Sequence, residues 1–136
     1  MKLPEGVHLA SSPELLLWKP SGLLNEKVVN KIIAFIRDEE AKLDANKLRF
    51  IDTTDLKAVD LNFRYVFHVA LYRRISRRGR SEIRSAFLVQ DPGFTHYFKL
   101  HALLTDHSSL HARLFDKAEA AAEWLGVPVE SLMIQS

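Results

Sequence analysis

Near the middle of the chain lies the stretch Ser85-Ala86-Phe87-Leu88-Val89, an uncharged and mostly apolar run of strand length. Such a run is typical of a strand that is buried on both faces of a sheet, as parallel strands in α/β proteins are. Asp91-Pro92-Gly93 follows it and predicts a turn, because Pro fixes φ and Gly admits positive φ. We therefore expect a central strand that ends in a tight turn.

Helical patterns flank this strand on both sides. Before it, Asp60 is the predicted N-cap of a helix from about Leu61 to Arg78, which Gly79 would end. After it, a helix is predicted over about Thr95 to Thr105. Strands separated by helices indicate an α/β layer structure, in which most crossover connections are right-handed.

The alternation continues towards both ends of the chain. Asn25 is the predicted N-cap of a helix from about Glu26 to Leu43, and Asp116 to Glu119 resembles a capping box that opens a last helix ending near Gly126. Further strands are predicted at Val7–Ala10, Leu15–Trp18, Leu48–Asp52 and Ala112–Phe115. The fold class that follows is α/β, with a single mixed, mostly parallel sheet of about five strands and about four helices in one domain over residues 1–136.

Composition excludes several classes of protein. The 136 residues are 47% hydrophobic and include no cysteine, which excludes disorder, a disulfide scaffold and thiolate chemistry. No apolar run approaches the ~20 residues of a membrane span, and the first ten residues lack the apolar core of a secretory signal. We therefore expect a soluble, cytoplasmic protein.

One segment holds most of the positive charge. The arginine cluster consists of Arg73, Arg74, Arg77, Arg78 and Arg80. Without these five residues, 14 Lys and Arg face 17 Asp and Glu, a net charge of −3. A mildly acidic body with one basic spot argues against nucleic acid as a partner. The alternatives are stabilisation of a helix C-terminus, an acidic partner, or an anionic lipid head group.

The predicted second helix is apolar or uncharged on both sides. Its expected core side holds Phe63, Val66, Phe67, Ala70 and Leu71. Its other side holds Leu61, Tyr65, His68, Val69, Tyr72 and Ser76. A helix without a charged face is usually buried all round, so a second subunit, a ligand or the chain's own ends should cover the outer side. The predicted binding patch consists of Leu61, Tyr65, Val69 and Tyr72 with Arg73, Arg74, Arg77 and Arg78.

Two further groups of side chains suggest chemistry only weakly. Four histidines lie within residues 96–111 at spacings of five, six and four, and the one pair four residues apart, His107 and His111, spans a predicted boundary between loop and strand. We therefore expect no metal. Asp52 and Asp60, with nearby histidines, form the alternative in which the protein is an enzyme. No phosphate-binding loop or nucleophile elbow is present, and we assign no catalytic residue and no cofactor.

The order of elements resembles that of the STAS/SpoIIAA-like family of anti-sigma-factor antagonists. The best-matching stretches are residues 98–104 and 111–125, which resemble the family's third helix, edge strand and capped last helix. Signalling members of the family carry an Asp-Ser-Ser-Gly-like motif, whose Ser is phosphorylated, at the start of the second helix. Here Asp60 is followed by Leu61 and Asn62, which have no hydroxyl group, and Thr53 and Thr54 are the nearest alternatives. The resemblance thus implies a phosphorylation switch that this sequence lacks.

These observations predict a non-enzymatic binding or regulatory module that acts through the second helix, most simply as a homodimer or with another protein. The alternative is an anionic, small-molecule or lipid-like ligand, held in a cavity beside the second or third helix.

Overall fold

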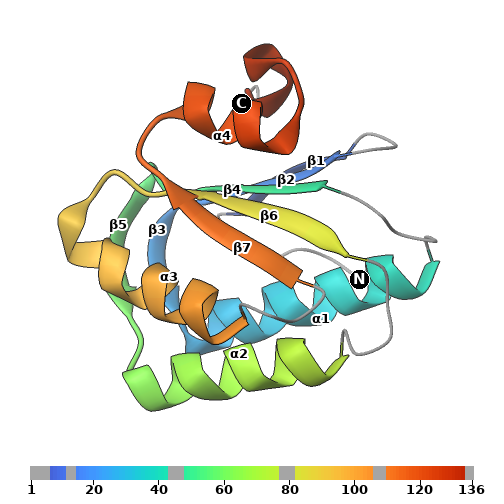
Figure 1. The fold of residues 1–136 in the computed structure, drawn as a ribbon. Coiled ribbons are helices and arrows are strands. Elements are labelled where there is room, and N and C mark those ends of the chain that lie inside the picture. Colours follow the sequence, from blue (N-terminus) through green and yellow to red (C-terminus); the bar gives the residue numbers. More distant parts are fainter. Residues whose placement is uncertain (1–6, 12–14, 43–47, 77–81, 106–109, 134–136) are drawn as a thin grey trace.

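The computed structural model describes residues 7–11, 15–42, 48–76, 82–105 and 110–133 (Figure 1). Its main sheet has five strands in the order β1-β2-β4-β6-β7. Their bounds are β1 Val7–Ser11, β2 Leu15–Pro20, β4 Leu48–Asp52, β6 Ile83–Leu88 and β7 Leu110–Phe115. Only the pair β1–β2 is antiparallel among the described strands, which confirms the predicted mixed, mostly parallel sheet.

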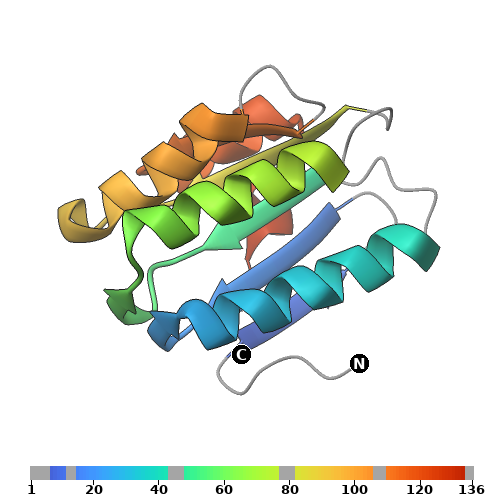
Figure 2. The same ribbon diagram turned by 90° about the horizontal axis from the view of Figure 1, so that it is seen from below.

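Helices cover both faces of this sheet. Three lie on one face, namely α1 (Glu26–Lys42), α2 (Phe63–Ser76) and α3 (Pro92–Thr105), as Figures 1 and 2 show. On the other face lie α4 (Ala118–Leu125) and the short 3-10 helix η1 (Val129–Leu132). The described part of the chain therefore contains the four α-helices expected. None of these helices is long and apolar enough to cross a membrane.

The central strands are apolar because each of their faces belongs to a different core. On β6, Phe87 packs in the core under α1 and α3, whereas Ala86 and Leu88 pack in the core under α4. Successive side chains of a strand point to opposite faces, so a strand covered on both sides is apolar at most of its positions. This explains the run at residues 85–89, of which Val89 lies just beyond the strand.

A second, two-stranded sheet was not predicted. It pairs β3 (Gly22–Asn25) in parallel with β5 (Leu56–Asp60), and Asp60 lies opposite Asn25. Asp60 therefore belongs to a strand, and the prediction that it caps the second helix is wrong. Asn62 is the cap instead, because its Oδ1 accepts a hydrogen bond of 2.8 Å from the backbone N–H of Tyr65.

Two other helix starts differ from prediction. The sequence Asp91-Pro92-Gly93 is the first turn of α3 and not a separate turn, because the Asp91 carboxylate accepts the Gly93 N–H at 2.7 Å and Pro suits the first helical position. The capping box at Asp116 does not form, since Lys117 is the N-cap of α4 and makes no side-chain cap.

The remaining described helix ends follow the prediction. Asn25 caps α1 through a 3.0 Å bond from the Val28 N–H, and Gly126 ends α4 with a positive φ of 76°. The predicted end of α2 at Gly79 lies outside the described residues.

Candidate functional site

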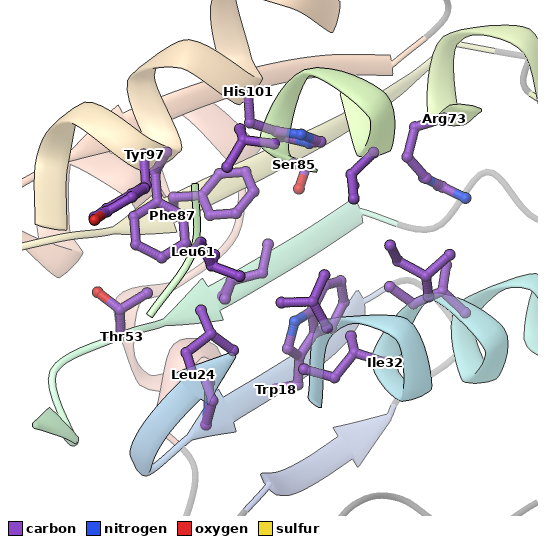
Figure 3. Close-up of a pocket in the computed structure, with 18 of the residues that line it drawn as sticks. Trp18, Leu24, Ile32, Thr53, Leu61, Arg73, Ser85, Phe87, Tyr97 and His101 are labelled. Atoms are coloured by element: carbon purple, nitrogen blue, oxygen red, sulfur yellow. The ribbon is translucent and has the colours of Figure 1, made fainter. Parts of the chain in front are cut away.

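A cavity of about 140 Å³ lies between the main sheet and helices α1, α2 and α3 (Figure 3). Side chains of β2, β4 and β6 form its floor, and the three helices form its walls. Its apolar lining includes Trp18, Ile32, Ile51, Val69, Phe87 and Phe98. An apolar enclosure bordered by a few polar groups is the usual form of a small-molecule site.

The cavity exists because α2 lies farther from the sheet than α1 and α3 do (Figure 1). Towards α3, α2 packs through aromatic rings, with Phe63 5.5 Å from His96 and 5.7 Å from Tyr97 between ring centroids. Towards α1, polar bridges join the two helices. The Tyr65 hydroxyl donates to Asn30 Oδ1 at 2.5 Å and approaches the Glu26 carbonyl oxygen at 3.2 Å.

Burial and the charge of Glu26 raise the pKa of Tyr65 above its ordinary value. The hydroxyl therefore stays protonated at neutral pH and remains a donor for the bridge to α1. A second bridge is longer, with Arg37 donating to the Tyr72 hydroxyl at 3.4 Å.

The rotation of α2 about its axis differs from prediction. Val66 and Ala70 are buried as expected, but Phe63, Phe67 and Leu71 are 54%, 47% and 46% exposed. Tyr65, Val69 and Arg73 point inwards to the cavity instead. Because apolar residues surround this helix, its periodicity does not determine the buried side. In the observed rotation Tyr65 bonds to α1 and Phe63 contacts α3.

The predicted binding patch is consequently divided. Leu61, Tyr65 and Val69 are partly buried and line the cavity, Arg73 is buried there too, and Tyr72 lies at the surface. Arg77, Arg78 and the side chain of Arg74 lie outside the described residues.

One end of the cavity is basic. Arg73 of α2 and Arg49 of β4 both line it and are only 4% and 3% exposed. In Figure 3, Arg73 lies at the end away from Thr53 and Tyr97. Arg49 is the second residue of β4 and precedes Thr53 by four residues, which is about 13 Å along the strand. Because Thr53 lies at the opposite end of the cavity from Arg73, Arg49 lies at the same end as Arg73.

Ser85 and His101 complete this basic end. Ser85 is buried on β6 directly opposite Arg49 in the strand register. His101 of α3 lies 5.9 Å from the Phe87 ring, and burial together with the nearby charge of Arg73 lowers its pKa to about 4. His101 is therefore neutral at pH 7 and offers an N–H without adding charge.

Arg49 was not singled out from the sequence. A signal for it was present, because Arg49 and Ile51 share a face of a strand that packs on both sides. A charged residue at such a position is exceptional in a core.

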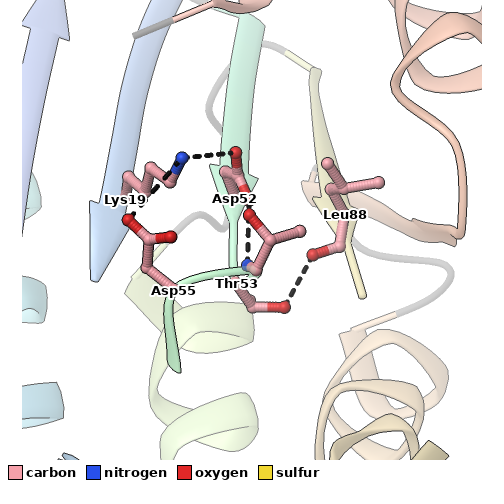
Figure 4. A network of polar contacts seen from close by, with 6 residues as sticks. Lys19, Asp52, Thr53, Asp55 and Leu88 are labelled. Carbon is pink, nitrogen blue, oxygen red and sulfur yellow. Dashed lines mark hydrogen bonds and ion pairs between the residues drawn. The ribbon is translucent and has the colours of Figure 1, made fainter. Parts of the chain in front are cut away.

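Asp52, one of the two aspartates proposed for the alternative enzyme, has other contacts, as Figure 4 shows together with its neighbour Asp55. Asp52 lies 3.5 Å from Lys19 Nζ and accepts hydrogen bonds from the N–H and hydroxyl of Thr54, at 2.9 and 2.6 Å. Asp55 lies 3.7 Å from the same Lys19. The Thr53 hydroxyl is buried and donates to the Leu88 carbonyl oxygen at 2.6 Å. These contacts fix the loop between β4 and β5.

The histidines are dispersed over the described residues. The ring centroids of His96 and Tyr97 lie 4.2 Å apart. His111 belongs to β7, and its Nε2 lies 3.5 Å from a carboxylate oxygen of Glu82. His107 lies outside the described residues. Within the part of the chain that the structure describes, no three His, Asp or Glu side chains are grouped as a metal site.

Comparisons with known proteins support the fold. No family model matches the sequence, and no curated protein matches it. A similar solved structure is that of an uncharacterized protein of the DUF3478 family from Shewanella loihica PV-4, described as having a SpoIIAA-like fold. The two chains are 15% identical with a TM-score of 0.56, and the match covers 88% of this chain and 93% of the other. Together with the sheet order and the helix layers, this likeness shows that the chain has a SpoIIAA-like fold, as its resemblance to STAS domains implied.

Proposed function

We propose that the protein is a cytoplasmic, non-enzymatic binding module whose site is the apolar cavity beneath α2. The observation that carries this proposal is the cavity itself, an apolar space of about 140 Å³ that a few polar side chains border. The cavity is partly open, and an apolar occupant would gain from removing its own surface and that of the lining from water.

The size of the cavity sets the size of the occupant. An engineered apolar cavity of about 150 Å³ takes up benzene, so this cavity suits a molecule of about six to nine non-hydrogen atoms.

Benzene titration of the full chain, followed by NMR of its methyl groups, tests the proposal. We expect benzene to shift the methyl signals of residues that line the cavity, such as Leu61 and Val69. Val69→Phe should abolish the shifts by filling the space. Leu71→Phe is the matched control, two positions along the same helix but on its exposed side, and should bind as the wild type does. Wild-type protein whose cavity methyl signals do not respond would refute the proposal.

A second candidate function is contact with another protein, most simply self-association, through the outer face of α2. The observation that favours it is the apolar stripe formed by Phe63, Phe67 and Leu71, at spacings of four residues. Large exposed apolar side chains in one row are unusual for a surface that contacts only water. This face replaces the one predicted from the sequence.

Light scattering at increasing concentration tests self-association. We expect a dimer for the wild type and a monomer for Phe67→Glu, whereas Lys31→Glu, at an exposed position of α1, should remain dimeric. A wild type that stays monomeric up to millimolar concentration would exclude self-association through this face.

In either function we propose that no phosphorylation switch operates at the start of α2. The segment Asp60-Leu61-Asn62 has no hydroxyl group, and the Asn62 side chain already caps the helix. Of the two nearby threonines, Thr53 is buried with its hydroxyl bonded to Leu88.

A further inference from the structure

We propose that the ligand of the cavity is a small monocarboxylate, with an apolar body of about six carbons and a carboxylate at the basic end formed by Arg49, Arg73, Ser85 and His101. This inference rests on the proposed cavity function and adds the charge and size of the ligand to it.

The distribution of charge along the cavity supports an anion. Among the described residues that line the space, two are arginines and none is Asp or Glu. Both guanidinium groups are almost fully buried, where the field of a charge is screened far less than at the surface. Burial and the charge of Arg73 together lower the pKa of His101, so the positive field of Arg73 extends to His101 at this end of the cavity.

The position of the two arginines supports a ligand with distinct ends. They lie at one end, next to Ser85 and His101, while Trp18, Leu61 and Val69 supply apolar surface along the rest. Arg49 and Arg73 also interact with other groups of the protein. That does not prevent recognition, since a guanidinium has five N–H donors and commonly serves more than one acceptor.

The enclosure favours one negative charge over two. Removing an ion from water is costly, and the cost rises steeply with charge, so a dianionic phosphate is a poor occupant of so apolar a space. A carboxylate matches the planar fork of an arginine and leaves most of the cavity to the apolar body.

Three ligands with the same six-carbon chain and different terminal groups separate the contribution of charge to binding from that of apolar contact. Hexanoate, 1-hexanol and hexylamine share a six-carbon chain and carry a negative, a neutral and a positive group at pH 7. Their dissociation constants for the full chain are measured by NMR titration, with the Leu61 and Val69 methyl signals reporting the site. We expect hexanoate to bind at least about tenfold more tightly than 1-hexanol, which corresponds to about 1.4 kcal/mol, and hexylamine to bind most weakly.

Substitutions then assign the preference to the arginines. Arg73→Gln and Arg49→Gln should each remove most of the preference for hexanoate while changing the affinity for 1-hexanol less than about threefold. Arg84→Gln is the control, because Arg84 lies on the same strand as Ser85 but points to the opposite face, where it donates to the Trp124 carbonyl oxygen at 2.7 Å. If a buried substitution prevents folding, the ranking of the three probes on the wild type decides alone.

The outcomes distinguish this inference from the function on which it rests. If 1-hexanol binds as tightly as hexanoate at the cavity signals, the carboxylate inference is wrong and the apolar site stands. If none of the three shifts those signals and benzene does not either, both are wrong. A preference for hexanoate that survives both arginine substitutions would also overturn the inference.

Discussion

The bridge from Tyr65 to α1 offers a sharp test of how the helices above the cavity are held together. Tyr65→Phe removes only the hydroxyl, which donates to Asn30 Oδ1 at 2.5 Å. One neutral hydrogen bond contributes ~0.5–1.5 kcal/mol, so we expect a loss of about 1 kcal/mol in the free energy of unfolding. At ~2.1 cal/mol/K per residue over 136 residues, this lowers Tm by about 3 °C. Urea unfolding followed by circular dichroism measures the free energy of unfolding of Tyr65→Phe and wild type, and thermal unfolding measures their Tm.

Tyr72→Phe is the matched control for this experiment. Its hydroxyl accepts only a 3.4 Å contact from Arg37 at the surface, so its removal should change stability by less than about 0.5 kcal/mol. A loss for Tyr65→Phe no larger than that for Tyr72→Phe would refute the argument that the Tyr65 bridge holds α2 against α1.

Alkaline titration adds a second measurement on the same residue. The pKa of Tyr65 is raised in the folded protein above its ordinary value of 10, so the folded state holds the proton more tightly than the unfolded state does. The stability from this residue is therefore complete below pH 10 and is lost as the pH rises through the folded pKa. Tyr65→Phe should lose less stability over that range than wild type, and equal losses would contradict the role of the hydroxyl.

Three further predictions concern stability. Asn62→Ala should lower the free energy of unfolding by about 1 kcal/mol, because α2 loses its N-cap. Asp60→Ala should change it by less than about 0.5 kcal/mol, because Asp60 lies on β5. A larger loss for Asp60→Ala than for Asn62→Ala in urea unfolding would show that Asp60 is the cap. The pKa of His101 falls from 6.5 to about 4 on folding, so unfolded chains bind the proton at a higher pH than folded ones. The free energy of unfolding should therefore decline by up to about 3 kcal/mol as the pH drops from 6.5 to 4. His101→Gln should flatten this decline in urea unfolding, and an unchanged slope would show that another group causes it. Gly126→Ala should destabilise the protein by about 1 kcal/mol, because φ is 76° there and a residue with a Cβ adopts that conformation at a cost. No atom lies within 4 Å of the added Cβ, so no steric clash adds to this cost. An unchanged Tm would show that α4 ends without this conformation.

Sequence reasoning located the sheet and the helices because their signals are local. The apolar run at residues 85–89, the Asn25 cap and the Gly126 stop each depend on side chains within a few residues of one another. The short strands β3 and β5 escaped prediction because a pair of four to five residues is stabilised by its partner strand, which lies over thirty residues away along the chain.

The candidate site was only half predictable for a related reason. That the second helix needed a cover was evident from its lack of a charged face, and Leu61, Tyr65 and Val69 do border a cavity. Which residues of that helix point outwards depended on contacts with α1 and α3, so Phe63, Phe67 and Leu71 were placed on the wrong side.

The amino-acid sequence by itself determined the alternation of strands and helices, since hydrophobic period and capping residues act over one or two turns of chain. Only the tertiary structure decided that Arg49 and Arg73, from a strand and a helix distant in sequence, lie at one end of an apolar space. The physical reason is that burial and electrostatic field depend on what surrounds a side chain in three dimensions, and no local pattern records that.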